Sequence, residues 1–230
     1  MQEKDSIEVN GFTHIRHAVP DLSQAEILLK ARSFYEFMDT RRSVRDFKAD
    51  PIPRQVIEDI IKTASTSPSG AHKQPWTFCA IADPEIKKQI RLAAEKEERE
   101  SYENRMSERW LKDLKPMGTD MHKPFLETVP WIIVAFKKAY ELDDEGNKHN
   151  NYYVNESVGL ACGMLITAIH NAGLVTLTHT PSPMDFLQKI LKRPANERAF
   201  LLLPVGKPAD PCYVPGIKRR PLKEVSEFYE

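Results

Sequence analysis

Residues 155–174, NESVGLACGMLITAIHNAGL, are the segment that most limits how this chain can fold. Apolar and small side chains follow one another through the segment, so a helix built from it is apolar on nearly every side. Such a helix has to be covered by other protein. We therefore expect a buried helix that packs against a sheet or a partner subunit. Asn155 or Ser157 should lie near its start, and Gly173 should be its C-cap.

The other apolar patterns predict short strands that alternate with helices. Ser23 and Glu26 have the spacing of a capping box at the start of one helix, and Pro53 suits the first turn of another. The expected helices are 23–42, 53 to the residues before Pro68, 83–114 and 182–192, and the expected strands are 76–82, 130–136, 174–180 and 199–206. This order predicts an α+β fold in which helices cover both faces of a mixed central sheet. Residues 1–20 show no clear period, and the proline-rich residues 207–230 read as an extended arm that could reach across a dimer.

Composition narrows the class of protein. Lys plus Arg and Asp plus Glu number 33 each, so no overall field favours nucleic acid or an anionic membrane. Three cysteines fit a reducing compartment rather than a disulfide scaffold. The start lacks the apolar core of a secretory signal, and no apolar run reaches the roughly 18 residues of a membrane span. We expect a cytoplasmic protein.

A basic cluster, RRSVRDF, places Arg41, Arg42 and Arg45 around Ser43. Planar guanidinium groups and a hydroxyl match the oxygens of a phosphate, so the cluster could be a phosphate clamp. It could equally be the cationic end of a helix, where the dipole favours positive charge. The sequence alone leaves both interpretations open.

A turn-rich loop, TSPSGAHKQPW at 66–76, separates a predicted helix from a predicted strand. Gly70 permits a backbone geometry that is closed to other residues, and Ser69 supplies a hydroxyl. The loop could bring backbone N–H groups close to a flat ligand, or it could be an ordinary connection.

Two further groups of polar residues deserve a functional test. Thr178, His179 and Thr180 end a predicted strand, where ligands often bind in open sheets, although alternating threonines are also ordinary strand residues. Glu98 and Tyr102 share a helix face in a run that could simply be a solvated charged helix. His14 and His17 lack further partners with metal-ligand spacing, and no metal site is expected.

Taken together, these motifs resemble the nitroreductase superfamily of flavin enzymes and, within it, the iodotyrosine deiodinases. The resemblance runs in order from about residue 34 to 225. It rests on FYEFMDTRRSVRDF, TSPSGAHKQPWTF, the spacing of Glu98, Tyr102 and Lys123, ESVGLACGMLITAIHNAGLVTLTHTP, LLLPVG and IKRRPL. It implies an extension over 1–33 and one FMN domain over 34–230. A lid at about 95–125 and a C-terminal arm at 207–230 belong to that domain, which forms an intertwined homodimer.

The resemblance also implies a role for each candidate residue. The FMN contacts would be Arg41, Arg42, Ser43, Arg45, Pro68, Ser69, Gly70, Thr178, His179, Thr180 and Arg219, with Arg219 supplied by the other subunit. Thr180 would donate a hydrogen bond to flavin N5, and animal members carry threonine at the position of His179. Glu98, Tyr102 and Lys123 would bind the zwitterion of the substrate, and the N–H of Ala71 would hold its phenolate.

The implied activity is FMN-dependent reductive dehalogenation of 3-iodo-L-tyrosine and other halotyrosines. Electrons would come from NADPH or a separate reductase. Animal members begin with a membrane anchor, and a soluble form is expected here. The alternatives are a general nitroaromatic or quinone reductase on the same fold, and a flavin-binding dimer without turnover.

Overall fold

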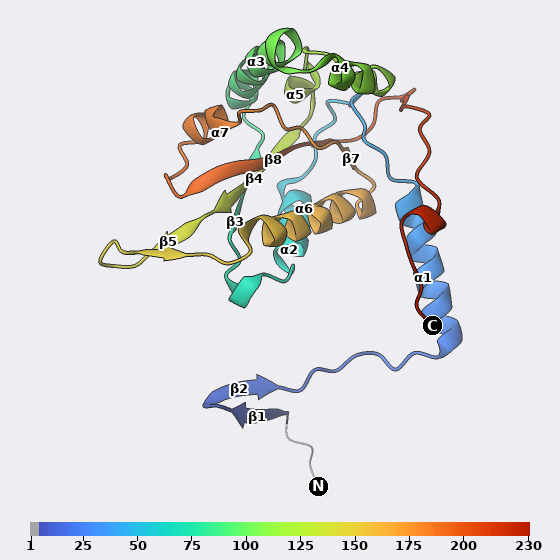
Figure 1. The fold of residues 1–230 in the computed structure, drawn as a ribbon, viewed down its shortest axis with the longest axis vertical. Helices are drawn as coiled ribbons and strands as arrows, with labels where there is room; N and C mark the ends of the chain where they lie inside the picture. The colour runs from blue at the N-terminus through green and yellow to red at the C-terminus, as the bar shows by residue number, and fades with distance from the viewer. Residues whose placement is uncertain (1–4) are drawn as a thin grey trace. The chain divides into compact units, whose positions relative to one another are not determined.

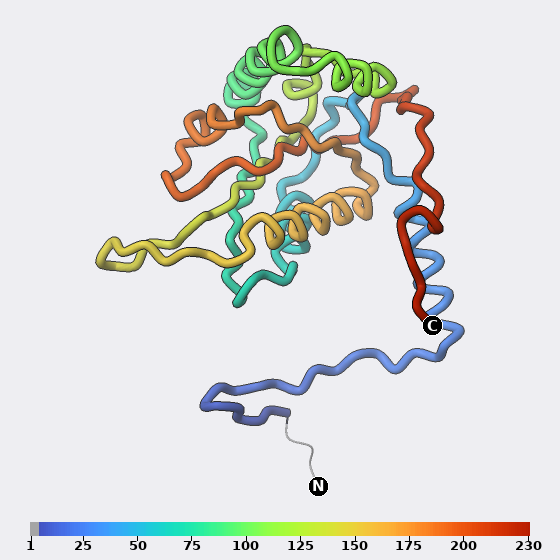
Figure 2. The backbone as a smooth tube through the Cα atoms, in the orientation of Figure 1, coloured from blue at the N-terminus to red at the C-terminus, as the bar shows by residue number. Residues whose placement is uncertain are grey.

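The structure is a computed structural model and describes residues 5–230. The chain divides into two units, Met1–Thr40 and Arg41–Glu230, and Figures 1 and 2 trace both. In the first unit, strands β1 (Ser6–Val9) and β2 (Phe12–Ile15) form an antiparallel hairpin, and helix α1 (Gln24–Asp39) follows. The capping box predicted at Ser23 and Glu26 begins this helix.

The second unit is built on a four-stranded sheet with the order β3-β4-β8-β7. Its strands are β3 (Trp76–Ile81), β4 (Trp131–Lys138), β7 (Val175–Thr176) and β8 (Glu197–Gly206). All three ladders are antiparallel, and one parallel bridge joins Ser43 to Thr176. The predicted α+β class is therefore confirmed, whereas the strands of the sheet pair antiparallel rather than in a mixed order.

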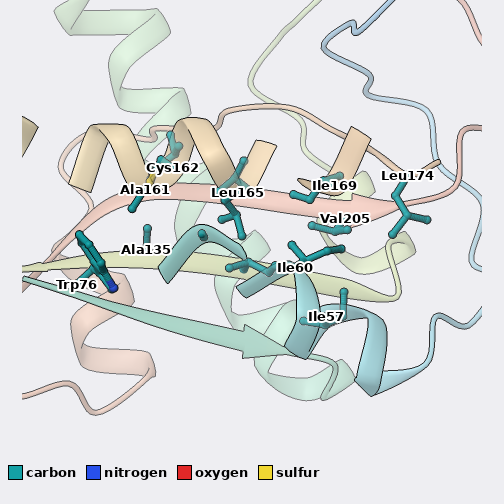
Figure 3. Close-up of a cluster of buried hydrophobic side chains, with 14 of the residues drawn as sticks. Ile57, Ile60, Trp76, Ala135, Ala161, Cys162, Leu165, Ile169, Leu174 and Val205 are labelled. Atoms are coloured by element: carbon teal, nitrogen blue, oxygen red, sulfur yellow. The ribbon is translucent and has the colours of Figure 1, made fainter. Parts of the chain in front are cut away.

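Helices cover both faces of this sheet, as the order of the predicted helices and strands implied. One face packs against α2 (Arg54–Ser65) and α6 (Val154–Asn171), and Figure 3 shows this cluster. The other face packs against α3 (Pro84–Glu100), α5 (Phe125–Thr128) and α7 (Asp185–Ile190). Successive residues of β4 alternate between the two clusters, because strand side chains point to opposite faces.

Helix α6 packs against the sheet, as one of the two interpretations of its apolar sequence predicted. Ala161, Leu165 and Ile169 are fully buried against the sheet and α2. The opposite face stays exposed in this chain: Leu160 is 54% exposed, and a Cβ at Gly159 or Gly163 would meet nothing within 4 Å. The half that the sheet does not cover is thus left apolar and small.

Several boundaries differ from the sequence-based predictions. Residues 6–15 are not irregular, because Asn10 and Gly11 both adopt positive φ and turn the chain into a hairpin. The helix predicted over 83–114 ends in a π-helical turn, η2 (Ser101–Arg105), and restarts as α4 (Glu108–Leu114) with Ser107 as its N-cap. The strand predicted over 174–180 is a strand only at Val175–Thr176, although His179 keeps an isolated bridge to Leu202.

The remaining elements are short. A second hairpin, β5 (Tyr140–Leu142) with β6 (Lys148–Asn150), projects from the sheet in Figure 1. Single turns are found at η1 (Gly70–His72), η3 (Lys115–Met117) and η4 (Leu222–Glu224). Apart from η4 and an antiparallel bridge between Pro208 and Phe47, residues 207–230 lack regular structure.

Candidate functional site

A strongly basic cavity of about 270 Å³ lies where the Arg cluster meets the C-terminal arm. It is lined by Arg41, Arg42, Ser43, Arg45, Met117, Pro215, Ile217, Lys218 and Arg219. These lining residues include cations from both segments and no carboxylate. The arm is fixed to the cluster by two hydrogen bonds to backbone carbonyls: Arg42 donates to Pro215, and Arg219 donates to Arg41 at 2.8 Å. Here Arg219 reaches the cluster of its own chain.

The Arg cluster follows the C-terminal end of a helix. Helix α1 ends at Asp39 with no basic residue in its last turn, and Arg41 comes directly after its C-cap Thr40, so the cations lie beyond the turn in which the dipole acts most strongly. The cluster runs beside β7, where Val44 N–H donates to Thr176 O at 3.2 Å. Partial burial and the guanidinium groups of Arg219 and Arg42 lower the pKa of Arg41 below its ordinary value. An anion in the cavity would relieve this repulsion.

A second cavity, of about 230 Å³, shares Arg45 with the first. It is lined by Arg45, Glu98, Tyr102, Met106, Trp110, Leu114, Thr119, Lys123, Phe125, Leu177, Thr178, His179 and Thr180. The structure thus gathers both polar groups singled out in the sequence, the strand end and the Glu98, Tyr102 and Lys123 set. We call this second space the lid cavity, because α4 and the π-helical turn form part of its wall.

Glu98 and Lys123 form a buried ion pair in the lid cavity. Glu98 Oε2 lies 3.8 Å from Lys123 Nζ, and their side chains are 12% and 4% exposed. Lys123 also donates to Thr119 Oγ1 at 3.1 Å and to the carbonyl of Asp120. Burial raises the pKa of Glu98 and lowers that of Lys123, while each opposes the shift of the other. Desolvation disfavours charges this deeply buried unless they are paired, and buried charged groups in a cavity are candidates for a functional site.

Tyr102 brings a phenol hydroxyl to the same wall. It donates to the Thr119 carbonyl at 3.2 Å, and Lys123 Nζ lies 6.0 Å from the centre of its ring. Burial and the nearby Glu98 raise the pKa of Tyr102, so the hydroxyl remains a donor at neutral pH. Tyr102 belongs to η2, and such π-helical turns are frequent at functional sites.

The strand end divides its side chains between two directions. Thr178 and Thr180 are exposed, whereas His179 between them is 6% exposed. His179 Nδ1 lies 3.8 Å from Glu98 Oε1, and its ring meets Phe125 edge-on at 6.1 Å between centres. Burial, reinforced by Lys123 and Arg45, lowers the pKa of His179 to about 3, so its imidazole is neutral.

The loop with Pro68, Ser69, Gly70 and Ala71 is held by local bonds. Ser69 Oγ accepts from Gln74 N at 2.9 Å, and Gly70 N donates to Ser157 Oγ at 3.3 Å. Gly70 itself has no positive φ, contrary to the expectation from sequence. A Cβ there would instead lie 2.9 Å from the Tyr152 carbonyl, so packing excludes a larger residue.

The unusual backbone in this loop follows Gly70. Ala71, His72 and Gln74 all adopt positive φ, a conformation uncommon for residues other than glycine. Strain of this kind tends to gather at ligand sites. Among the residues that the structure describes, no acceptor meets the Ala71 N–H, which leaves it available to a ligand.

The loop and the two cavities lie at opposite ends of α6 within one chain. Ser157, which holds Gly70, is in the first turn of this 18-residue helix, whereas Thr176 and the Arg cluster follow its end. At about 1.5 Å per residue, roughly 25 Å of helix separates them. Figure 1 likewise shows η1 in the layer of α2 and α6, and α4 on the other side of the sheet. One chain does not assemble all the candidate residues.

Some lining residues were not singled out by sequence. Met106, Leu114 and Phe125 give the lid cavity apolar walls, and Lys218 adds a cation to the basic one. No local pattern distinguishes these residues from ordinary surface or core positions. Within residues 5–230 there is no group of three His, Cys, Asp or Glu that could hold a metal, and none of the helices there is long and apolar enough to cross a membrane.

The chain is similar to one group of known proteins over most of its length. A model of the nitroreductase family matches residues 38–207. An iodotyrosine deiodinase from Haliscomenobacter hydrossis is 59% identical over 94% of this chain and 97% of that protein. The corresponding protein of Nematostella vectensis is 43% identical over 96% and 86%, and human iodotyrosine deiodinase 1 is 40% identical over 97% and 76%. A crystal structure of oxidized iodotyrosine deiodinase bound to FMN and 3-iodo-L-tyrosine matches with a TM-score of 0.71 and 29% identity, covering 84% of this chain and 99% of that one.

Proposed function

Because the chain belongs to the nitroreductase family and, within it, to the iodotyrosine deiodinases, we propose that it reduces 3-iodo-L-tyrosine and other halotyrosines to L-tyrosine and halide with FMN as cofactor. One observation carries the proposal furthest. The lid cavity holds a paired carboxylate and ammonium beside a strand end, and it shares Arg45 with a cavity of cations. A general nitroaromatic reductase on this fold has no need of that pair.

The basic cavity fits the phosphate of FMN. The cavity is lined by cations from two segments, and burial together with two neighbouring guanidinium groups lowers the pKa of Arg41. The phosphate is bound by Arg41, Arg42, Arg45 and Arg219, with the Ser43 hydroxyl as a further donor. Bound there, FMN supplies the electrons of the reaction. Thr178 and Thr180 would flank the ring, with Thr180 as the hydrogen-bond donor to flavin N5, whereas the side chain of His179 between them points toward Glu98.

The lid cavity binds the amino-acid head of the substrate. Glu98 accepts from the ammonium, while Lys123 and Tyr102 donate to the carboxylate. Because Glu98 and Lys123 already neutralise each other at 3.8 Å, a zwitterion can insert between them without leaving either charge unpaired. A ligand with only one of the two charges would leave a buried partner unsatisfied.

The reaction replaces the C–I bond of the ring by a C–H bond. Two electrons and one proton are consumed, and iodide leaves with the electron pair of the broken bond. The exposed N–H of Ala71 holds the phenolate oxygen, and the iodine substituent favours this contact because it lowers the phenol pKa. The contact therefore discriminates against tyrosine, the product.

The assembly is a homodimer in which the partner's loop completes each site. The exposed face of α6, with Gly159, Leu160 and Gly163, is self-complementary, since small residues let two helices approach closely. A two-fold axis across the middle of α6 places the two helices antiparallel. The first turn of one helix then lies beside the last turn of the other, so that Pro68, Ser69, Gly70 and Ala71 of one subunit meet the cavities of the other.

Electrons reach the site from NADPH or through a separate reductase in the cytoplasm. All three cysteines, Cys79, Cys162 and Cys212, are free, which suits a reducing compartment. Adding NADPH alone to the purified protein separates the two routes, because only the direct route reduces the flavin without another protein.

Iodide release from 3-iodo-L-tyrosine tests the function. The purified protein is supplied with FMN and dithionite, and a nitroaromatic is reduced in a parallel reaction. We expect iodide in stoichiometric yield with tyrosine. Rapid nitro reduction without iodide release would instead assign the chain to the general reductases of the family. A protein that binds no flavin would be neither a deiodinase nor a general reductase.

A further inference from the structure

His179 combines deep burial with an unsatisfied polar atom. Its side chain is 6% exposed, and Nε2 has no hydrogen-bond partner among the residues that the structure describes. Its backbone is fixed to the sheet, since N–H donates to Leu202 O at 2.9 Å and Leu202 N–H donates back at 3.1 Å. A buried polar atom without a partner is uncommon and calls for an explanation.

The direction of the ring separates His179 from the two threonines beside it. In extended backbone, successive side chains point to opposite sides. Thr178 and Thr180 are exposed, and His179 points the other way, to within 3.8 Å of Glu98. His179 therefore faces the lid residues rather than sharing the direction of the residues proposed to flank the flavin.

The charges around the ring keep it neutral and fix what it can offer. Lys123 and Arg45 repel a proton on the imidazole, and Glu98 is the carboxylate that attracts one. Phe125 packs against one edge, and Tyr102 lines the same cavity. A neutral imidazole has one donor and one acceptor. If Nδ1–H faces Glu98, then Nε2 is left as an acceptor with less than 1 Å² of accessible surface, so the ring can act on the cavity only through Nδ1.

We propose that His179 is a positioning residue for the amino-acid head of the substrate, a role that rests on the proposed function. On binding, Nδ1–H donates to Glu98 Oε1 and orients this carboxylate toward the ammonium of the halotyrosine. His179 thus acts through Glu98 and makes no contact of its own with the head group.

Ligand binding to the FMN-loaded dimer tests the proposal without turnover. Quenching of flavin fluorescence gives the Kd of 3-iodo-L-tyrosine and of 2-iodophenol, which lacks the head group. His179→Phe keeps a ring against Phe125 and removes both nitrogens. We expect the Kd of 3-iodo-L-tyrosine to rise about tenfold or more and that of 2-iodophenol to stay within about twofold. His149→Phe, on the β5–β6 hairpin outside the cavity, is the matched control and should change neither Kd.

Two further variants test the contacts separately. His179→Gln keeps an amide N–H that can donate to Glu98, and we expect it to recover part of the affinity that His179→Phe loses. Glu98→Gln combined with His179→Phe should cost less than the sum of the single changes, because the histidine acts through Glu98.

The results distinguish the inference from the function beneath it. If the wild-type protein binds no 3-iodo-L-tyrosine, both fail. If wild type binds it but His179→Phe weakens both ligands equally, His179 is only a packing residue. An unchanged ratio of the two Kd values would also overturn the inference. If His179→Phe does not fold, the ratio of the two Kd values in His179→Gln decides instead. A ratio equal to that of wild type, together with additive effects of His179→Gln and Glu98→Gln, would overturn the inference.

Discussion

Replacing Glu98 by Gln removes one charge from the lid cavity while keeping the shape of the side chain. In the wild-type protein Glu98 lies 3.8 Å from both Lys123 Nζ and His179 Nδ1. The amide can no longer balance the ammonium of a substrate. It also leaves Lys123 with neutral acceptors only, the Thr119 hydroxyl and the Asp120 carbonyl.

The expected loss follows from one charge-assisted hydrogen bond. Such a bond contributes about 1.5–3 kcal/mol, so the Kd of 3-iodo-L-tyrosine should rise about 10- to 150-fold. FMN affinity should not change, because Glu98 does not line the basic cavity. Stability should also fall, by up to about 3–5 kcal/mol, because Lys123 is left as a buried charge without its carboxylate partner.

Fluorescence titration of the FMN-loaded protein measures both quantities. Glu103→Gln is the matched control, because Glu103 is an exposed carboxylate in the same π-helical turn and lines neither cavity. A Kd for 3-iodo-L-tyrosine that stays within twofold of wild type in Glu98→Gln would refute the role given to this residue. It would leave the buried ion pair as a purely structural feature.

Three further changes have defined outcomes. The unfolded state binds a proton at His179 below about pH 6.5 and the folded state only near pH 3, so the free energy of unfolding should fall by about 2 kcal/mol between pH 8 and pH 5 on this account. Urea unfolding of His179→Phe at both pH values should lack this part of the pH dependence. A pH dependence equal to that of wild type would contradict the buried neutral ring. Leu160→Asp charges the exposed face of α6 and should give a monomer in sedimentation with little iodide release. Leu142→Asp, at an exposed position on β5, is the control and should remain dimeric. If both variants are dimers, α6 is excluded from the interface. Gly70→Ala places a methyl group 2.9 Å from the Tyr152 carbonyl and should cost about 1–3 kcal/mol in thermal unfolding, and an unchanged Tm would show that the loop yields freely.

Local signals in the sequence predicted the elements that depend on near neighbours. The capping box at Ser23 and the two-sided apolar strand at 130–136 needed no distant contact to be recognised. The Asn10–Gly11 turn was also a local signal, but its strands are fully exposed, so no burial pattern drew attention to it. The interruption at Met106 lies within a charged run whose helical pattern continues on both sides.

Features set by distant parts of the chain could not be predicted in this way. The basic cavity closes only because Arg219 meets Arg41 across 178 positions of sequence. Gly70 is required by Tyr152 rather than by its own φ, which no local pattern reveals. The resemblance to a family grouped these residues in advance, whereas the direction of His179 needed the folded strand.

The length of α6 has a genetic consequence. It keeps the Arg cluster and the Gly70 loop of one chain too far apart to serve the same site, so each proposed site draws on two chains. A subunit with Arg42→Ala and a subunit with Gly70→Val are each inactive as homodimers. In a mixed dimer both lesions fall in one site and the other site is intact. Random mixing of the two subunits should therefore restore about a quarter of the wild-type sites. Two inactive alleles of the same gene then complement each other.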